Sequence, residues 1–201
     1  MADDITAPAS PGPDAVRDLA TACVASVRAT LAFDLDFTPD TLAVLDHYAK
    51  EVVQEEDATI LQLVAPMCGA YFGEVVRREL GAARWHAPDD TYRLWRLELE
   101  PAFLHFNPLG VALEVLRGED APGWYAHLQF LDDDRSLVAS TTENLGAVKA
   151  EDYYRFTVRH EVVQGVAANL AEKPRLPGQP VYFGPEVYAA AAEQSQESRT
   201  N

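Results

Sequence analysis

Hydrophobic residues in the first 80 positions recur every three to four residues, which is the period of a helix that buries one face. The pattern predicts helices over about 14–31, 38–52 and 56–80. Thr38 is predicted to cap the second of these helices, since threonine favours the residue before the first turn. Pro66 is expected to kink or split the third, because proline removes a backbone donor inside a helix.

After Gly81 the hydrophobic period changes to two, which is typical of strands. We predict antiparallel strands at 83–87, 93–100 and 102–106, and in the second of these Arg96, Glu98 and Glu100 form the solvent-facing side. Four further segments are predicted along the chain. The first is a helix over 107–118, for which the alternation of Val111, Leu113 and Val115 leaves a strand as the alternative. A strand at 123–131 and helices over 132–146 and 151–173 follow. The predicted fold class is α+β, with helices packed on a small antiparallel sheet and flexible N- and C-terminal segments.

Three parts of the chain differ in composition. Residues 1–13 are polar and proline-rich, as in a disordered arm. Residues 14–173 carry the periodic patterns and are predicted to form a single α+β domain. Residues 174–201 are predicted to hold a proline-rich linker, a short helix from about Glu186 and a polar tail.

Two glycines one turn apart, Gly69 and Gly73, continue a stripe of small residues that begins at Ala65. Glycine inside a helix costs about 1 kcal/mol relative to alanine, so a local gain must offset it. We predict that this glycine stripe lets another backbone approach the helix closely. The alternative is that a ligand or a partner approaches it.

The chain of 201 residues has a net charge of −16, from 32 acidic and 16 basic side chains. This charge argues against nucleic-acid binding, which needs cations at the phosphates, and against docking on anionic membranes. No apolar run approaches the roughly 20 residues that span a bilayer, and the N-terminus has no secretion signal. We therefore expect a cytoplasmic protein, in which Cys23 and Cys68 are small core residues.

Short catalytic motifs are missing or out of context. No serine elbow, Walker A loop or dinucleotide-binding glycine motif occurs, so neither an enzyme activity nor a cofactor is predicted. The five histidines have no metal-ligand spacing, and no metal is expected; His160 is predicted to pair with Glu161. Asp34, Asp36 and Thr38 resemble the DxDxT loop of haloacid-dehalogenase-type phosphatases, but that loop must follow an apolar strand, and here a helix precedes it.

Arginine and aromatic residues gather between positions 77 and 96 of this acidic chain, a group that we call the arginine cluster. Such a mixture is typical both of interaction surfaces and of anion pockets. The alternative is that the arginines pair with the surplus carboxylates and lie over the sheet. The candidate binding residues are Arg77, Arg78, Arg84, Trp85, His86, Arg93, Trp95 and, as an anion contact at a helix start, Asn107.

The C-terminal part contains the string PVYFGPEVY behind its proline-rich linker. It has the composition of a short docking peptide, with apolar anchors and a solvated flank. The candidate docking residues are Val181, Tyr182, Phe183 and Tyr188.

Three segments together resemble a family of uncharacterised bacterial proteins: GAYFGEVVRRELGAARW at 69–85, FNPLGVALEVLRG at 106–118 and AEDYYRFTVRHEVV at 150–163. The resemblance covers about residues 35–172. It implies an α+β bacterial domain of unknown function and brings no catalytic residues with it.

We therefore expect a non-enzymatic binding or accessory protein that acts through contact with another protein, in part through its C-terminal tail. One alternative is an enzyme or sensor that binds a small anionic metabolite at the arginine cluster, with Glu74 or His86 transferring protons. A further alternative is a structural subunit of a homo-oligomer.

Overall fold

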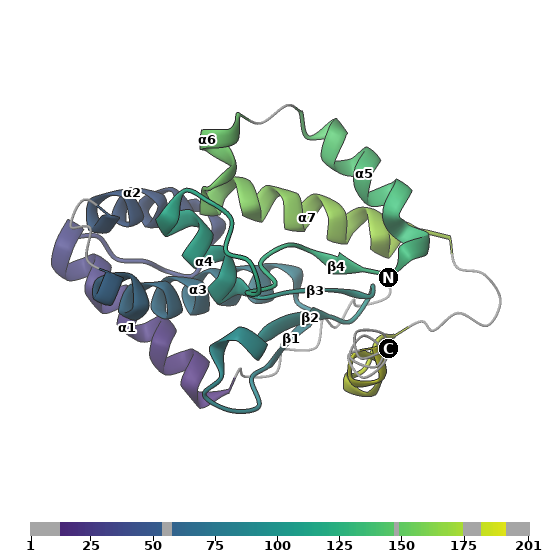
Figure 1. Cartoon of the computed structure of the whole chain (residues 1–201), viewed down its shortest axis with the longest axis horizontal. Coiled ribbons are helices and arrows are strands. Elements are labelled where there is room, and N and C mark those ends of the chain that lie inside the picture. The colour runs from purple at the N-terminus through teal and green to yellow at the C-terminus, as the bar shows by residue number, and fades with distance from the viewer. Residues whose placement is uncertain (1–12, 54–57, 147–148, 175–181, 192–201) are drawn as a thin grey trace, which may run out of the picture.

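Helices pack against a four-stranded antiparallel sheet (Figure 1), which confirms the predicted fold class. The computed structural model describes residues 13–53, 58–146, 149–174 and 182–191. The predicted N-terminal arm lies outside these residues except for Pro13. The helices are α1 Asp14–Leu31, α2 Leu42–Val53, α3 Ala58–Leu80, α4 Pro108–Arg117, α5 Arg135–Asn144, α6 Ala150–Tyr153 and α7 Phe156–Glu172; the strands are β1 Ala83–His86, β2 Arg96–Leu99, β3 Leu104–Phe106 and β4 Gln129–Phe130; short 3-10 turns span η1 Pro39–Thr41, η2 Tyr92–Leu94 and η3 Asp132–Asp134.

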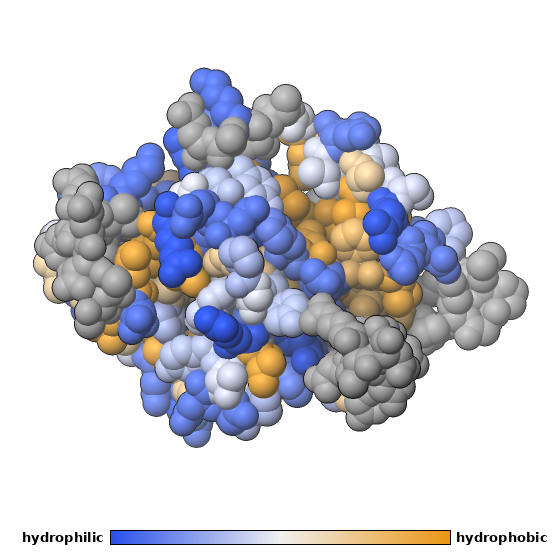
Figure 2. All heavy atoms as spheres, viewed as in Figure 1, coloured by the Kyte–Doolittle hydropathy of each residue, from blue (hydrophilic) through white to orange (hydrophobic). Residues whose placement is uncertain are grey.

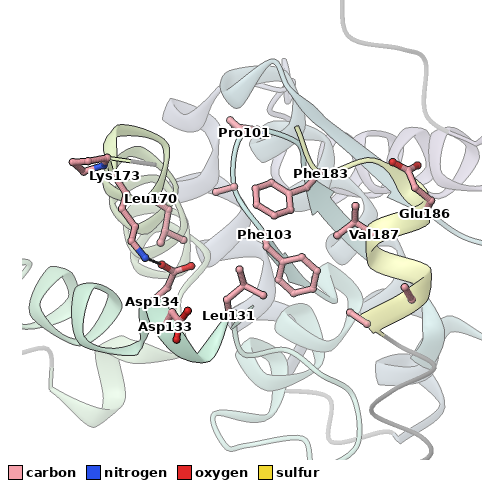
Figure 3. A pocket seen from close by; sticks show the side chains of 14 residues that line it. Pro101, Phe103, Leu131, Asp133, Asp134, Leu170, Lys173, Phe183, Glu186 and Val187 are labelled. Carbon is pink, nitrogen blue, oxygen red and sulfur yellow. Dashed lines mark hydrogen bonds and ion pairs between the residues drawn. The ribbon is translucent and has the colours of Figure 1, made fainter. Parts of the chain in front are cut away.

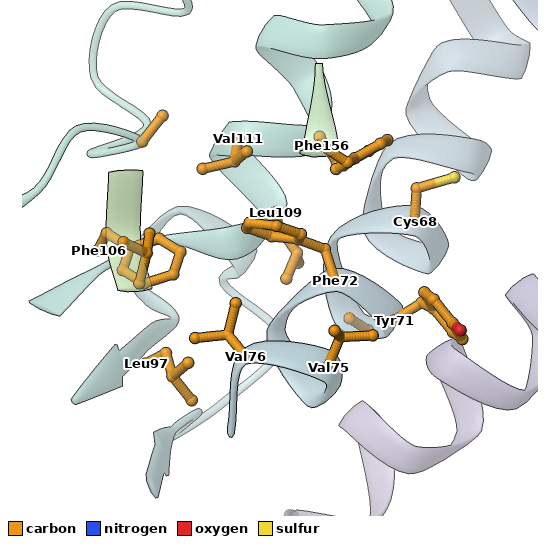
Figure 4. Packing of buried hydrophobic residues seen from close by; sticks show 14 of the residues in the cluster. Cys68, Tyr71, Phe72, Val75, Val76, Leu97, Phe106, Leu109, Val111 and Phe156 are labelled. Carbon is orange, nitrogen blue, oxygen red and sulfur yellow. The ribbon is translucent and has the colours of Figure 1, made fainter. Parts of the chain in front are cut away.

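Helix α3 lies at the centre of the fold, between α1 on one side and α4 on the other. Its aromatic residue Phe72 is fully buried and contacts the ring of Phe106 from the sheet and the ring of Phe156 from α7 (Figure 4). One core therefore joins the early helices, the sheet and the last long helix. Pro66 lies inside α3 and does not split it.

The glycine stripe of α3 faces this core, as predicted. A Cβ atom added at Gly69 would lie 2.4 Å from the Cα of Leu109, at the start of α4. A Cβ added at Gly73 would lie 2.2 Å from the ring of Trp85. The small residues thus allow the α4 backbone and an indole ring to contact α3 directly, and no ligand space remains at either glycine.

Asn107 and Gly118 set the bounds of α4, which is a helix rather than the alternative strand. The Asn107 side chain accepts hydrogen bonds from the backbone N–H groups of Leu109 and Gly110, at 2.9 and 3.2 Å. Gly118 ends the helix with a φ of 67°, in the left-handed region that glycine adopts without a steric penalty.

The sheet is a meander of order β1-β2-β3-β4 with every pair antiparallel. In the centre, Leu97 pairs with Phe106 and Glu98 pairs with His105. Leu97 and Phe106 belong to the core, so Glu98 and His105 lie on the opposite surface of the sheet, which we call the outer face.

Three sequence predictions need correction in length or geometry. The strand predicted over 93–100 is shorter, because residues 92–94 form the turn η2. The strand predicted over 123–131 is reduced to β4, and Tyr125 within it has a φ of 52° that no strand accommodates. Thr38 makes no side-chain cap; Asp36 instead accepts hydrogen bonds from the Thr38 backbone N–H and hydroxyl.

The helix predicted over 151–173 is interrupted between α6 and α7. The cause is Asp46 of α2, whose carboxylate accepts hydrogen bonds from the backbone N–H groups of Phe156 and Thr157, at 2.6 and 3.3 Å, and from the Thr157 hydroxyl at 2.7 Å. These are donors that a helix start leaves unsatisfied. Burial raises the pKa of Asp46, although these hydrogen bonds favour its charged form. Helix α7 therefore receives its cap from a different helix.

Cys23 and Cys68 are free, buried thiols on α1 and α3, as predicted for core residues. A hydrogen bond with Cys23, together with complete burial, raises the pKa of Cys68. Among the residues that the structure describes, no helix is long and apolar enough to cross a membrane.

Candidate functional site

The outer face of the sheet carries a row of polar side chains across its four strands. Arg84 of β1 pairs in register with Glu98 of β2, Glu98 with His105 of β3, and His105 with Gln129 of β4. Side chains directly opposite each other on antiparallel strands lie on the same face and are near neighbours. The sheet therefore brings residues from four separate segments into one polar row.

Glu98 is the centre of this row and is only 1% exposed. Its carboxylate forms ion pairs with Arg84 at 2.8 Å and with Arg96 at 2.7 Å. Arg84 also pairs with Glu100 at 3.2 Å. The charges in the row thus largely compensate one another, and Glu98 is buried rather than solvent-facing as its alternation predicts.

His105 is neutral at physiological pH. Burial, together with the nearby charge of Arg96, lowers its pKa to about 4. The pKa of His86 is also lowered, by burial and by Arg96. Neither imidazole therefore adds a positive charge to the outer face at pH 7. The outer face is accordingly a weaker candidate for binding an anion.

The C-terminal segment, residues 182–191, covers part of this outer face. Its helical turn places the ring of Tyr188 parallel to Phe103, at a centroid distance of 4.6 Å, and edge-on to His105. The Tyr188 hydroxyl accepts a hydrogen bond from the backbone N–H of Leu104 and lies 2.5 Å from the carbonyl oxygen of Leu99, to which it donates. Tyr188 is 2% exposed and burial raises its pKa. This predicted docking residue is therefore docked within its own chain.

The other docking candidates flank Tyr188. The Phe183 backbone N–H donates to the Glu100 carbonyl at 3.0 Å, and the Phe183 carbonyl accepts from Arg84 at 3.1 Å. Tyr182 donates its hydroxyl proton to the Glu100 carboxylate at 2.8 Å and keeps 54% of its surface exposed. Val181 lies outside the described residues. The segment is held by backbone and side-chain hydrogen bonds as well as by apolar contact.

Two clefts flank the C-terminal segment and share Phe103 and Ala191 in their walls. The larger, about 550 Å³, lies between this segment and the end of α7 (Figure 3). In Figure 3, Phe103 and Leu131 point toward its centre, and the ion pair of Lys173 with Asp134 closes one side. The smaller cleft, about 290 Å³, includes Arg93, Arg96, His105 and Tyr125.

The structure does not gather the arginine cluster into one pocket. Arg77 is buried and makes a two-point ion pair with Glu74, whose Oε1 also accepts from the Trp85 indole at 2.9 Å. The same hydrogen bonds hold the pKa of Glu74 below its usual value despite burial. Arg78 lies 3.9 Å from the centre of the Phe37 ring. None of Arg77, Arg84 and His86 lines either cleft.

The remaining candidates are mostly structural. Trp95 is 2% exposed and donates its indole N–H to the Asp89 carbonyl. Asn107 is fully buried, and its amide donates to the carbonyls of Tyr92 and Arg93, so its side chain holds the fold rather than an anion. Arg93 is exposed and lies over the Trp124 ring at 5.3 Å.

Two further groups of residues that the sequence analysis singled out contact other residues in the structure. Asp34 pairs with Arg28, and Asp36 holds the turn before α2, so the DxDxT string is a turn. His160 contacts Glu79 of α3 instead of Glu161. Sequence reasoning missed Phe103 and Leu131 as cleft residues, because isolated apolar positions beside a strand carry no signal of what faces them.

Comparison with protein-family models, with curated proteins and with solved structures finds no match to this chain. The resemblance to a bacterial family of unknown function therefore stays a prediction.

Proposed function

We propose that this protein is a non-enzymatic accessory protein that binds a protein partner on the surface formed by the C-terminal segment and its two flanking clefts. One observation carries the proposal: large exposed hydrophobic side chains gather there. Leu94 and Tyr125 line the smaller cleft, Leu131 lines the larger, and Tyr182 belongs to the segment itself. Their exposed fractions are 52%, 44%, 42% and 54%.

Large exposed apolar side chains around clefts are typical of interaction sites, because a monomer gains nothing by exposing them to water. Figure 2 shows an exposed hydrophobic area beside α5. Aromatic and aliphatic side chains around shallow clefts also match the centres of known interfaces, where a few anchors fill pockets on the partner. The charges of Arg84 and Arg96 are compensated by those of Glu98 and Glu100, which favours such a neutral contact.

The proposal changes the role of the C-terminal segment, residues 182–191. Because Tyr188 and Phe183 are bound within the chain, residues 182–191 are part of the binding surface and are not a free peptide that reaches a partner. Removing residues 174–201 would also uncover the Leu104 N–H and Phe103. A truncation alone therefore cannot distinguish loss of the partner from damage to the sheet.

Site-specific photocrosslinking in cells tests the proposal without a truncation. A photoreactive amino acid replaces Leu131 or Tyr125 in the full chain, and Leu63 serves as the matched control, since it is 67% exposed on α3. The expected result is a shared heterologous adduct from positions 131 and 125 that is missing from position 63. The same adduct from all three positions, or none from 131 and 125, would refute the proposal, and an adduct with a second copy would favour the homo-oligomer.

One observation favours a second candidate, the binding of a small anion in the 290 Å³ cleft. Arg93 lines this cleft and, in the part of the chain that the structure describes, has no carboxylate partner. A thermal-shift screen with phosphorylated and carboxylated metabolites tests it. A stabilisation that Arg93→Gln abolishes would support this candidate, and equal stabilisation of both proteins would reject it.

A further inference from the structure

A second cluster of polar residues, none of which lines either cleft, lies around the C-terminal end of α4. Glu114 of α4 and Asp120 and His127 of the following loop each offer one ligand atom, and these atoms lie within 4.8 Å of one another. We infer that this cluster binds one divalent transition-metal cation of the zinc type. The inference is independent of the proposed function.

The geometry around the His127 ring leaves one nitrogen available. Its Nδ1 lies 3.2 Å from the Tyr153 hydroxyl, close enough for a hydrogen bond that fixes the ring. Its Nε2 faces the two carboxylates, 3.6 Å from Glu114 Oε1 and 3.8 Å from Asp120 Oδ1. A histidine whose other nitrogen is held by a hydrogen bond is the usual arrangement at protein metal sites.

These separations are close to those of a bound ion. Two ligands at the usual zinc distances in a tetrahedral arrangement are about 3.4 Å apart. The His127 nitrogen would therefore approach each carboxylate by only a few tenths of an ångström. The side chains of His127 and Asp120 are 54% and 63% exposed, so both can adjust and an ion can enter from solvent.

The buried Glu114 carboxylate is held in place by contacts with the rest of the protein. It is 1% exposed, its Oε1 accepts from the Ala121 backbone N–H at 3.2 Å, and its Oε2 forms an ion pair with Arg159 at 3.0 Å. These two contacts hold the Glu114 carboxylate in place, with Oε1 toward His127.

The ligand chemistry selects the class of ion. One imidazole nitrogen with two carboxylate oxygens suits zinc and its neighbours, whereas magnesium and calcium prefer oxygen ligands alone. The three ligands carry a formal charge of −2, since the histidine binds a metal in its neutral form. With Arg159 counted, the site has a net charge of −1 and still attracts a dication. Three protein ligands leave a fourth position for water.

Titration of the metal-stripped full chain with Zn²⁺ by isothermal calorimetry tests the inference. The expected result is one Zn²⁺ per chain, with an affinity at least about tenfold lower in His127→Gln and in Asp120→Asn. His47→Gln is the matched control, because His47 is an exposed histidine of α2 outside the cluster, and it should bind as the natural chain does. Mg²⁺ at the same concentration should give no comparable signal.

Both test substitutions replace exposed side chains, so the variants are expected to fold, and circular dichroism checks this. Failure of the natural chain to bind Zn²⁺ would overturn the inference and leave His127 beside two carboxylates with no bound ion. Binding that is unchanged in either cluster variant, or lost in His47→Gln, would place the metal elsewhere and overturn it equally.

Discussion

Replacing Gly69 by alanine tests whether the small residues of α3 serve the contact with α4. An added Cβ would lie 2.4 Å from Leu109 Cα, 2.7 Å from the Pro108 carbonyl oxygen and 2.8 Å from Leu109 N. Ordinary van der Waals contacts at such a position begin at 3.4 Å. The shortest contact must therefore open by about 1 Å, and because all three neighbours are backbone atoms, the two helices must move apart.

The expected effect is a net loss of stability. Alanine gains about 1 kcal/mol over glycine in helix propensity. Overpacking a close-packed core costs roughly 1–3 kcal/mol, and the upper end applies where backbone must move. We expect Gly69→Ala to lower the free energy of unfolding by about 2 kcal/mol.

The matched control is Gly165→Ala in α7. A Cβ added at Gly165 would lie 3.5 Å from the nearest atom, a methyl of Leu145, which is an ordinary contact. Without a clash, only the propensity gain remains, so this variant should be more stable than the natural chain by up to about 1 kcal/mol.

Equilibrium unfolding in urea, followed by tryptophan fluorescence, measures both variants. With a denaturant dependence of about 2 kcal/mol per molar, the midpoint of Gly69→Ala should fall by about 1 M. If the midpoint of Gly69→Ala rises together with that of Gly165→Ala, the contact between α3 and α4 tolerates a Cβ at position 69. That result would refute the reasoning.

Three further outcomes are expected. Tyr188→Phe keeps the ring but leaves the Leu104 N–H without its acceptor, at a cost of about 1–3 kcal/mol, and should accelerate hydrogen exchange in residues 182–191; unchanged exchange would contradict this. Because the pKa of His105 is about 4 in the folded chain against 6.5 normally, the unfolded state binds the proton first as pH falls, so stability is complete above pH 6.5 and decreases below it. Between pH 7 and 5 the loss from this group is about 2 kcal/mol, and urea midpoints should show a shallower pH dependence in His105→Gln than in the natural chain. Cys23 and Cys68 should react with a thiol reagent only after denaturation, and rapid modification of the folded chain would contradict their burial.

The elements with a strong local signal could be predicted from sequence. Residues close together in the chain indicate the helical period of α1 to α3 and the Asn-Pro start and glycine end of α4. The spacing of the small residues on α3 likewise indicates a close contact, which the structure shows to be with Leu109 and Trp85. The break between α6 and α7 could not be predicted, since its cause is Asp46, 110 residues before Phe156.

The candidate site was less predictable for the same reason. Alternation placed Glu98 toward solvent, and it does lie on the outer face, but the ion pairs with Arg84 and Arg96 and the contact of Tyr188 with that face bury it. Composition singled out arginines between 77 and 96, and most of them pair with nearby carboxylates. A local count of charges cannot show which of them pair.

The cap that Asp46 provides to α7 can form only late in the synthesis of the chain. During translation, α2 emerges long before residues 156 and 157, so its carboxylate has no backbone partner until most of the chain has left the ribosome. The contact between α2 and the start of α7 therefore forms only late in synthesis, and nascent chains that stop before α7 should be preferred substrates for chaperones and proteases.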